Sequence, residues 1–135
     1  DTVWKGAATG KSRASYEGLI EIVEGATNSH TYLQTHSLML SRNAKVDAIP
    51  SLIVKVDDVS ASHGGTVGEV DEDQVFYMRT RGITRENAIR ILVEGYFEPV
   101  IAQFDDEHLE TLVRERIAAK PVAAHDDIVA YAATR

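Results

Sequence analysis

The sequence predicts an all-β region followed by a small group of helices. Between residues 15 and 70 the chain holds short runs of β-branched and aliphatic residues, each bounded by Gly, Asn, Asp, Ser or Pro. Beyond residue 70, apolar residues recur at spacings of three and four, which is the pattern of amphipathic helices. At 135 residues, the chain has the length of one domain with one core.

Residues 1–14 precede the regular region and contain Trp4, several small residues and scattered basic residues. This composition is consistent with one coil of a longer structure whose neighbours are missing. Because such a coil exposes unpaired backbone edges, we expect residues 1–14 to be poorly ordered.

The apolar runs between residues 15 and 70 repeat along the chain. Residues 20–26 superpose on residues 38–44 with an offset of eighteen, and the apolar element returns at residues 52–54 after a further fourteen. The two-residue Asn-Gly or Asp-Gly turns that mark hairpins are missing. This pattern favours a solenoid of parallel coils over a hairpin meander, and it leaves a β-sandwich or a barrel open. The predicted strands are residues 19–23, 31–34, 38–40, 46–48 and 52–56.

Three helices are predicted after the strands, at residues 71–79, 84–98 and 106–119. Asp71 and Gln74 resemble a capping box at the start of the first helix, and Gly82 lies where its C′ residue is expected. Thr84 is the predicted cap of the second helix, and Pro99 is expected to end or kink that helix near residue 98. An acidic pair starts the third helix and the proline at 121 ends it, which leaves an Ala-rich tail that is expected to be weakly ordered.

Composition excludes several classes of partner. Fourteen basic residues against twenty-one acidic residues give a net charge of −7, which argues against a phosphate-binding surface and therefore against nucleic acid. No apolar run reaches the length of about 18 residues that a membrane span needs, so we expect no membrane contact. The chain has no cysteine, which excludes disulfides and any metal centre held by thiolates of these residues, and fits the reducing cytoplasm.

One histidine lies in a glycine-rich stretch between the strands and the helices. His63 is held between Ser62 and the pair Gly64-Gly65, and two aspartates precede it. A histidine in such a bend is most often a turn residue that hydrogen-bonds locally. The alternative is a ligand set, because a bend can bring carboxylate and imidazole together, although this spacing fits no standard zinc site.

The other histidines and the serines give little support for metal binding or catalysis. His30 and His36 are six residues apart, so on one extended strand they share a face but lie about 20 Å apart, too far for one metal ion. Ser62 is adjacent to His63 in sequence rather than arranged as a nucleophile with its base, and no Gly-x-Ser-x-Gly elbow or Walker A loop is present. We therefore expect no metal site, no catalytic residue and no nucleotide hydrolysis by this chain.

Two motifs together resemble a known family. The first is D-D-V-x-x-S-H-G-x-T-V-G at residues 57–68, and the second is F-Y-M-R-T-R-G-I at residues 76–83. With the preceding turns they are similar to the SufB/SufD family of iron–sulfur cluster assembly proteins, over residues 16–101. The Ser62-His63-Gly64 form is closer to the SufD-type subunit, because the SufB type usually has His-Glu-Ala-Thr. Family members are several times longer and this chain does not begin with methionine, so it is expected to be the C-terminal part of a larger protein.

The resemblance implies a fold and a set of partners. It implies the last coils of a right-handed parallel β-helix at residues 1–70, a helical region at 71–120 and a weakly ordered tail at 121–135. In this family two homologous subunits pair through their β-helices, and each binds the ABC-type ATPase SufC by its helical region. We therefore expect no cofactor bound by this chain alone, and an iron–sulfur cluster only in the full complex.

The resemblance also implies a role for His63. In SufD-type chains the equivalent histidine lies at the subunit interface and is implicated in cluster assembly. Many of those chains have Cys-Ser-His-Gly where this sequence has Ala61, so a thiol role at this position is not supported.

The second predicted helix offers a candidate docking surface for the ATPase. Its wide apolar stripe extends to its last turn, and the acidic residues beside that turn would form a charged rim, as protein-binding surfaces often have. The alternative is that this stripe is core against the strands. The candidate docking residues are Tyr96, Phe97, Glu98, Val100, Ile101, Asp105 and Asp106.

The sequence thus predicts a non-catalytic scaffold subunit that forms a homodimer in isolation, because an open strand edge recruits a second copy. One alternative is a β-solenoid acyltransferase with His63 as base, although the strict six-residue repeat of such enzymes is not sustained. The other alternative is a plain dimerisation module.

Overall fold

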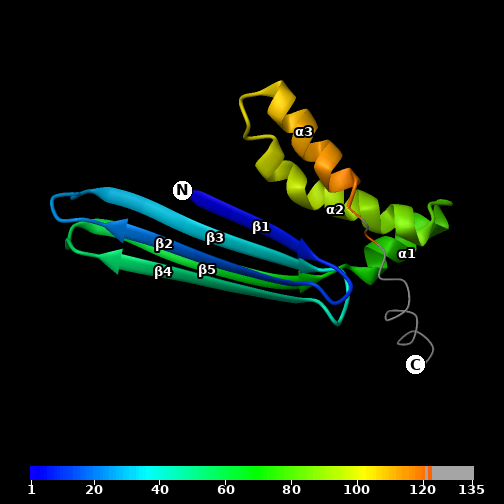
Figure 1. Ribbon diagram of the computed structural model, residues 1–135, viewed down its shortest axis with the longest axis horizontal. Helices are drawn as coiled ribbons and strands as arrows, with labels where there is room; N and C mark the ends of the chain where they lie inside the picture. The colour runs from blue at the N-terminus through cyan, green and yellow to red at the C-terminus, as the bar shows by residue number, and fades with distance from the viewer. Residues whose placement is uncertain (121, 123–135) are drawn as a thin grey trace.

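The computed structural model describes residues 1–120 and residue 122. Five strands come first and three helices follow (Figure 1). The strands are β1 Thr2–Ala8, β2 Arg13–Ile22, β3 Ser29–Met39, β4 Lys45–Val54 and β5 Val59–Glu69. The helices are α1 Glu72–Thr80, α2 Arg85–Ile101 and α3 Glu107–Ala118.

The strands alternate along the chain between two parallel sheets. One sheet has the order β1-β3-β5 and the other has the order β2-β4. The two sheets run in opposite directions; α1 lies beyond the ends of β3 and β5, and α2 and α3 lie on the β1 side of the strands (Figure 1). Trp4 of β1 stacks on Tyr16 of β2 with ring centroids 4.8 Å apart, which ties one sheet to the other. The predicted parallel pairing is confirmed.

The prediction of a right-handed parallel β-helix is wrong. Over residues 1–120 and 122, the structure has two open parallel sheets and three helices, an α/β arrangement with no closed solenoid. The repeat in the sequence reflects the pairing of parallel strands, but it does not show whether the sheets close into a solenoid. Ile20 pairs with Leu52, thirty-two residues away, which is the sum of the two offsets seen in the sequence. The intermediate copy at residue 38 lies in β3 of the other sheet.

Residues 1–14 also differ from the expectation of poor order. Thr2–Ala8 form β1, which is paired in parallel with β3 from Thr2 opposite Leu33 to Ala8 opposite Met39. A turn follows in which the Ser12 N–H donates to the Thr9 carbonyl at 3.1 Å. The N-terminal segment is regular because β3 lies in the middle of its sheet and uses both of its edges.

The three predicted helices are confirmed together with their starts. The side chains of Asp71, Thr84 and Asp106 each accept hydrogen bonds from N–H groups in the first turn of the helix that they cap. Gly82 follows α1 with a φ of 84°, as expected of a C′ residue. α2 does not end at Pro99 but continues to Ile101, because the N–H of residue 102 already donates to the carbonyl of residue 98, at 2.9 Å.

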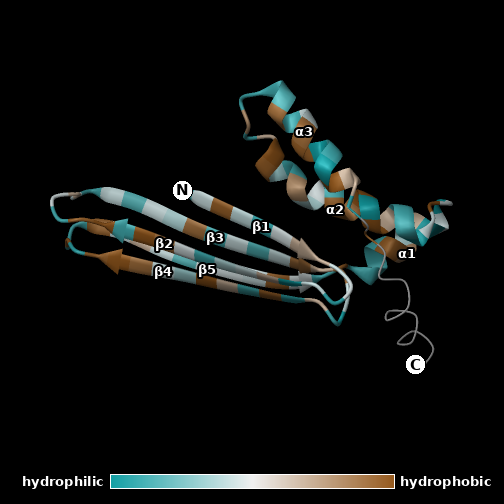
Figure 2. Ribbon diagram, viewed as in Figure 1, coloured by the Kyte–Doolittle hydropathy of each residue, from teal (hydrophilic) through white to brown (hydrophobic). Residues whose placement is uncertain are grey.

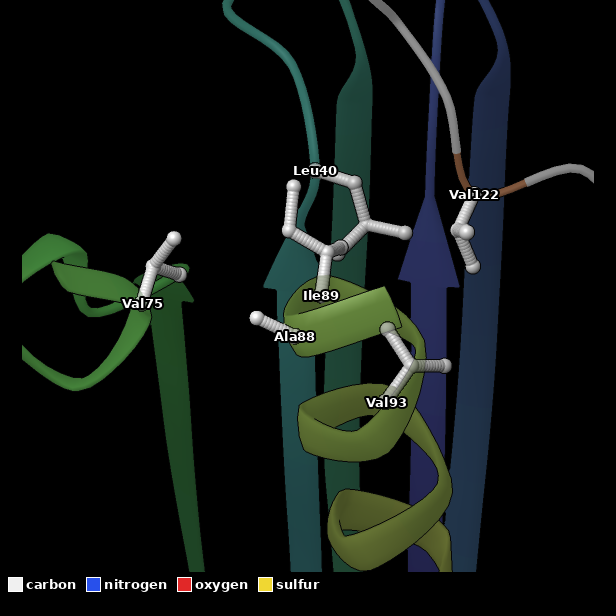
Figure 3. Packing of buried hydrophobic residues seen from close by; sticks show 6 residues of the cluster. All are labelled: Leu40, Val75, Ala88, Ile89, Val93 and Val122. Atoms are coloured by element: carbon white, nitrogen blue, oxygen red, sulfur yellow. The ribbon is translucent and has the colours of Figure 1, made fainter. Parts of the chain in front are cut away.

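The main apolar core lies where the end of β3 meets α1 and α2. Figure 3 shows its side chains gathered beside the strand ends, from Leu40, Val75, Ala88, Ile89, Val93 and Val122. α3 contributes no fully buried residue, and hydrophilic and hydrophobic segments alternate along it (Figure 2). No helix in the described part of the chain is long and apolar enough to cross a membrane. Apart from Val122, the predicted tail at 121–135 lies outside the described residues.

Candidate functional site

His63 lies on β5, at the outer edge of the three-stranded sheet. β5 pairs with β3 alone, so its second edge carries backbone N–H and C=O groups without a partner strand in residues 1–120 and 122. His63 stands opposite Leu33 in the parallel register, and its side chain is exposed. An imidazole in this position is accessible to a second protein chain that approaches the edge.

The glycines after His63 are not part of a bend. Gly64 and Gly65 lie within β5, and neither has a positive φ. Both are instead places of close approach to β3. A Cβ at Gly64 would lie 2.8 Å from the Tyr32 hydroxyl, and a Cβ at Gly65 would lie 2.7 Å from the Thr35 Oγ1. The predicted turn histidine is therefore a strand histidine, on a strand that packs closely against its neighbour.

Another histidine forms the polar contacts that the sequence did not reveal. His36 Nδ1 lies 2.8 Å from Thr66 Oγ1, and His36 Nε2 lies 3.3 Å from Gln34 Oε1. The register places Lys5 of β1, His36 of β3 and Thr66 of β5 in one row across the sheet. Thirty residues separate His36 from Thr66, so no local motif could indicate this contact.

The histidines and aspartates considered as metal ligands lie on or before different strands. Among residues 1–120 and 122, no three His, Asp or Glu side chains lie close enough to hold a metal ion. His30 and His36 both lie on β3 at positions of equal parity, so they share a face. Asp57 and Asp58 precede β5, and the Asp58 carbonyl accepts a hydrogen bond from the Asn28 N–H at 2.6 Å.

Tyr96 attaches α2 to β1. The Lys5 ammonium donates to the Tyr96 carbonyl at 2.7 Å and lies 4.8 Å from the centre of its ring. The Tyr96 hydroxyl donates in turn to the Gly6 carbonyl at 3.4 Å. Burial raises the pKa of Tyr96 to about 12, and the hydrogen bond to Gly6 opposes this shift. Tyr96 is thus engaged within the chain.

Two further candidate docking residues point into the core. Phe97 packs against the main apolar cluster, and Ile101 is only 3% exposed. Both match the alternative in which the stripe of the second helix is core. Val100 keeps part of its surface accessible at the end of α2.

The three acidic candidates differ in whether they already have partners within the chain. Glu98 forms a bidentate ion pair with Arg114 of α3, which lowers the pKa of Glu98, and Arg114 also bonds Glu110 at 3.2 Å. Asp106 is the N-cap of α3 and accepts a hydrogen bond from the Leu109 N–H at 3.0 Å. Asp105 is exposed and forms no ion pair within the described residues. Of the acidic candidates, Asp105 is therefore the one most available to a partner.

Two aromatic side chains of α1 are more exposed than any of the candidate aromatic residues. Phe76 and Tyr77 are 66% and 60% exposed. Arg81 Nη2 donates to the Tyr77 hydroxyl at 3.1 Å, and its guanidinium lies 5.2 Å from the ring centre. Phe76 and Tyr77 belong to the second motif of the sequence, and they do not pack into the core.

Comparisons with known proteins assign the family. Residues 1–96 match the family described as SUF system FeS cluster assembly, SufBD core domain. The chain belongs to the SufBD family. It is 34% identical over 110 residues to the iron–sulfur cluster assembly protein SufD of Escherichia coli (strain K12), and 37% identical over 92 residues to SufD of Bacillus subtilis (strain 168). It is also 33% identical over 112 residues to the SufBD family protein Mb1496 of Mycobacterium bovis.

These matches confirm the predicted SufB/SufD membership and its SufD type. They cover 82% of this chain for the E. coli protein, 68% for the B. subtilis protein and 83% for the M. bovis protein. The chain spans only 26%, 21% and 13% of the length of those relatives. The matched family region contains all five strands, α1 and most of α2, and therefore includes His63.

Proposed function

We propose that this SufBD family chain acts as part of a non-catalytic scaffold for iron–sulfur cluster assembly in the cytoplasm. The observation that carries the proposal is the place of His63, the histidine of the family motif, exposed on the open-edged strand β5. The alternative of a β-solenoid acyltransferase loses its premise, because the described strands form two open sheets and no closed solenoid.

Pairing with a homologous SufB/SufD-type subunit is supported by the free edge of β5. Among the described strands, its eleven residues pair with β3 on one side only, and strands with such edges add further strands readily. A partner strand on this edge would bring its own side chains beside His63. A cluster would then form between two subunits, which fits a chain that has no cysteine of its own to hold one.

The proposed chemistry of His63 follows from the imidazole group. Neutral imidazole is a borderline ligand for iron, and a histidine can carry a proton near neutral pH. The side chain is exposed, so it reaches a partner without a change in the fold of this chain.

Docking of an ABC-type ATPase of the SufC kind is proposed for the helical region. Asp105 and part of Val100 are accessible at the junction of α2 and α3. Because Glu98 and Asp106 stabilise α3, reversing their charge would disturb the helix as well as a docking surface. Asp105→Lys is the sharper test: it should weaken binding of the ATPase in a pull-down while the melting temperature stays unchanged. Unchanged binding would count against this surface.

The central test is His63→Ala in the full-length protein, with His30→Ala on β3 as the matched strand histidine. His63→Ala should leave the melting temperature within about 2 °C and sharply lower the iron–sulfur cluster formed by the assembled complex, because an exposed side chain contributes little to stability. His30→Ala should change neither. A loss of several kcal/mol of stability in His63→Ala would show that the residue is structural. Full cluster assembly by His63→Ala would leave a plain dimerisation module as the remaining interpretation of this chain.

A further inference from the structure

A groove with a volume of about 550 Å3 lies between α2 and α3. This volume is in the range of ordinary binding sites. Both helices contribute apolar residues to its lining, which are Ile91, Gly95, Ile101, Ile117 and Ala118. Ile91 is 45% exposed although it is a large apolar residue, so the groove presents uncovered hydrophobic surface.

Gly95 leaves a gap in the α2 wall of this groove. Residues 91, 94, 95 and 98 line the groove at spacings of three and four, so they occupy one face of the helix. A Cβ placed on Gly95 would meet no described atom within 4 Å apart from its chain neighbours and the nearby backbone of its own helix. Pro99, four residues further on, has no N–H, so the helical hydrogen bond to the Gly95 carbonyl cannot form. The gap thus combines room for an incoming side chain with a carbonyl that lacks its helical donor.

The charged residues of the groove are predominantly acidic. Of the described residues, Glu94, Glu98 and Glu115 line it together with Arg114, and these four side chains carry a net charge of −2. Arg114 is already engaged by Glu98 and Glu110. Glu94 and Glu115 form no ion pair with the residues that the structure describes. The groove therefore favours an occupant that is both apolar and positively charged.

We propose that the α2–α3 groove binds a basic amphipathic helix of a protein partner. Apolar side chains of that helix would cover Ile91 and enter the gap at Gly95, and its lysines or arginines would meet Glu94 and Glu115. A helix suits the site because α2 and α3 already form a helix pair, and the small residues Gly95 and Ala118 allow a third helix to approach closely. This inference rests on the proposed docking role of the helical region, and it names the chemistry of the docked segment.

The test uses a fluorescent leucine–lysine peptide of about 18 residues, or five helical turns, whose leucines follow helical spacing. Its comparator is an isomer of the same composition in scrambled order, which keeps the charge and loses the apolar face. Binding to the full-length protein is measured by fluorescence anisotropy. The scrambled isomer should bind at least about tenfold more weakly than the amphipathic peptide, because a central apolar contact carries most of the affinity in such interfaces.

The decisive variant is Gly95→Leu, which places a large apolar side chain in the gap, where an added Cβ meets no atom outside its own helix backbone, and replaces glycine by a better helix former. Its matched control is Asn87→Leu, an exposed position of the same helix outside the groove. Gly95→Leu should lower peptide affinity at least about tenfold and leave the melting temperature unchanged or higher, whereas Asn87→Leu should not change affinity. Glu94→Lys combined with Glu115→Lys should lower affinity as well.

Three results would overturn the proposal. The first is equal affinity of Gly95→Leu and the unmodified protein for the peptide. The second is equal affinity for both peptide isomers, which would show attraction by net charge alone. The third is self-association that Gly95→Leu removes in sedimentation experiments, which would make a second copy of the chain the occupant. None of these results depends on cluster assembly, so they are separate from a failure of the His63 experiment.

Discussion

At the scale of single residues, the two glycines after His63 differ in what an added methyl group would displace. At Gly65 it would meet the Oγ1 of Thr35, a residue that is 1% exposed and whose hydroxyl donates to the Gly64 carbonyl at 3.4 Å. At Gly64 it would meet the end of the Tyr32 side chain, which is 38% exposed and has room to move.

Gly65→Ala should therefore destabilise the protein by about 1–3 kcal/mol, because the buried threonine cannot yield without losing its hydrogen bond. Gly64→Ala should cost less than about 1 kcal/mol, since the exposed tyrosine can swing aside. Urea denaturation of the two variants measures the difference. Equal losses would mean that both positions respond to backbone conformation rather than to the side chain opposite.

The sequence could not predict these contacts, although it did single out His63. A glycine pair beside a histidine is typical of a bend, and nothing local shows that Gly65 meets Thr35, thirty residues away, and Gly64 meets Tyr32, thirty-two residues away, across a parallel ladder. The bond between His36 and Thr66 escaped prediction for the same reason. Residue types indicate which chemistry is available, but the register decides which side chains meet.

At the scale of secondary structure, the helices were predictable because the signals that start them are local. Asp71, Thr84 and Asp106 all bond N–H groups within three residues. α2 continues past Pro99 because the helical hydrogen bonds resume directly after it. The rule that proline ends a helix considers the residue type alone and does not include these later hydrogen bonds. Phe97 packs against a cluster that includes Leu40 and Val75, which lie far from it in the sequence, so its burial could be offered from sequence only as an alternative.

α3 is the helix held most weakly, and acid should release it first. It has no fully buried residue, and its ion pair with α2 joins Arg114 to Glu98. Because this pair lowers the pKa of Glu98 in the folded protein, its stabilisation is complete above the usual value of 4.5 and is lost as the pH falls through the lowered value. Hydrogen-exchange protection factors of the α3 amides should therefore fall more than those of α2 between about pH 6 and about pH 3.

Glu98→Gln supplies the control for this expectation. It removes the charge at residue 98 of α2 and retains the acidic groups of α3, so the specific difference between α3 and α2 should disappear. The effect should also shrink at high salt, since both partners are exposed and screening weakens such pairs. If α3 in Glu98→Gln still loses protection with acid as the unmodified protein does, another carboxylate controls the helix.

At the scale of the whole molecule, the parallel pairing of the strands could be predicted from the sequence, but whether the sheets close into a solenoid could not. Alternating offsets of eighteen and fourteen residues indicate strands that return to the same place after thirty-two, and the register of β2 with β4 has that spacing. Whether such strands enclose a solenoid depends on how the connections bend and on what covers the sheet edges. Those features are non-local, and here the structure leaves two open sheets with α1 beyond the strand ends and α2 beside β1.

The open edge of β5 leads to the last prediction, which concerns self-association. Val67 lies on this edge strand and is 57% exposed, opposite Ser37 in the register. A lysine at an edge discourages the addition of another strand, because its charge would be buried in the new pair. Val67→Lys should therefore raise the dissociation constant of the homodimer that we expect of the isolated chain by at least about tenfold, measured by sedimentation equilibrium.

Phe76→Lys is the matched control, because Phe76 is at least as exposed but lies on α1, away from any strand edge. A strict monomer at high concentration would contradict pairing at this edge, and an equal effect of both lysines would show that general hydrophobic contact, rather than strand addition, holds the two copies together.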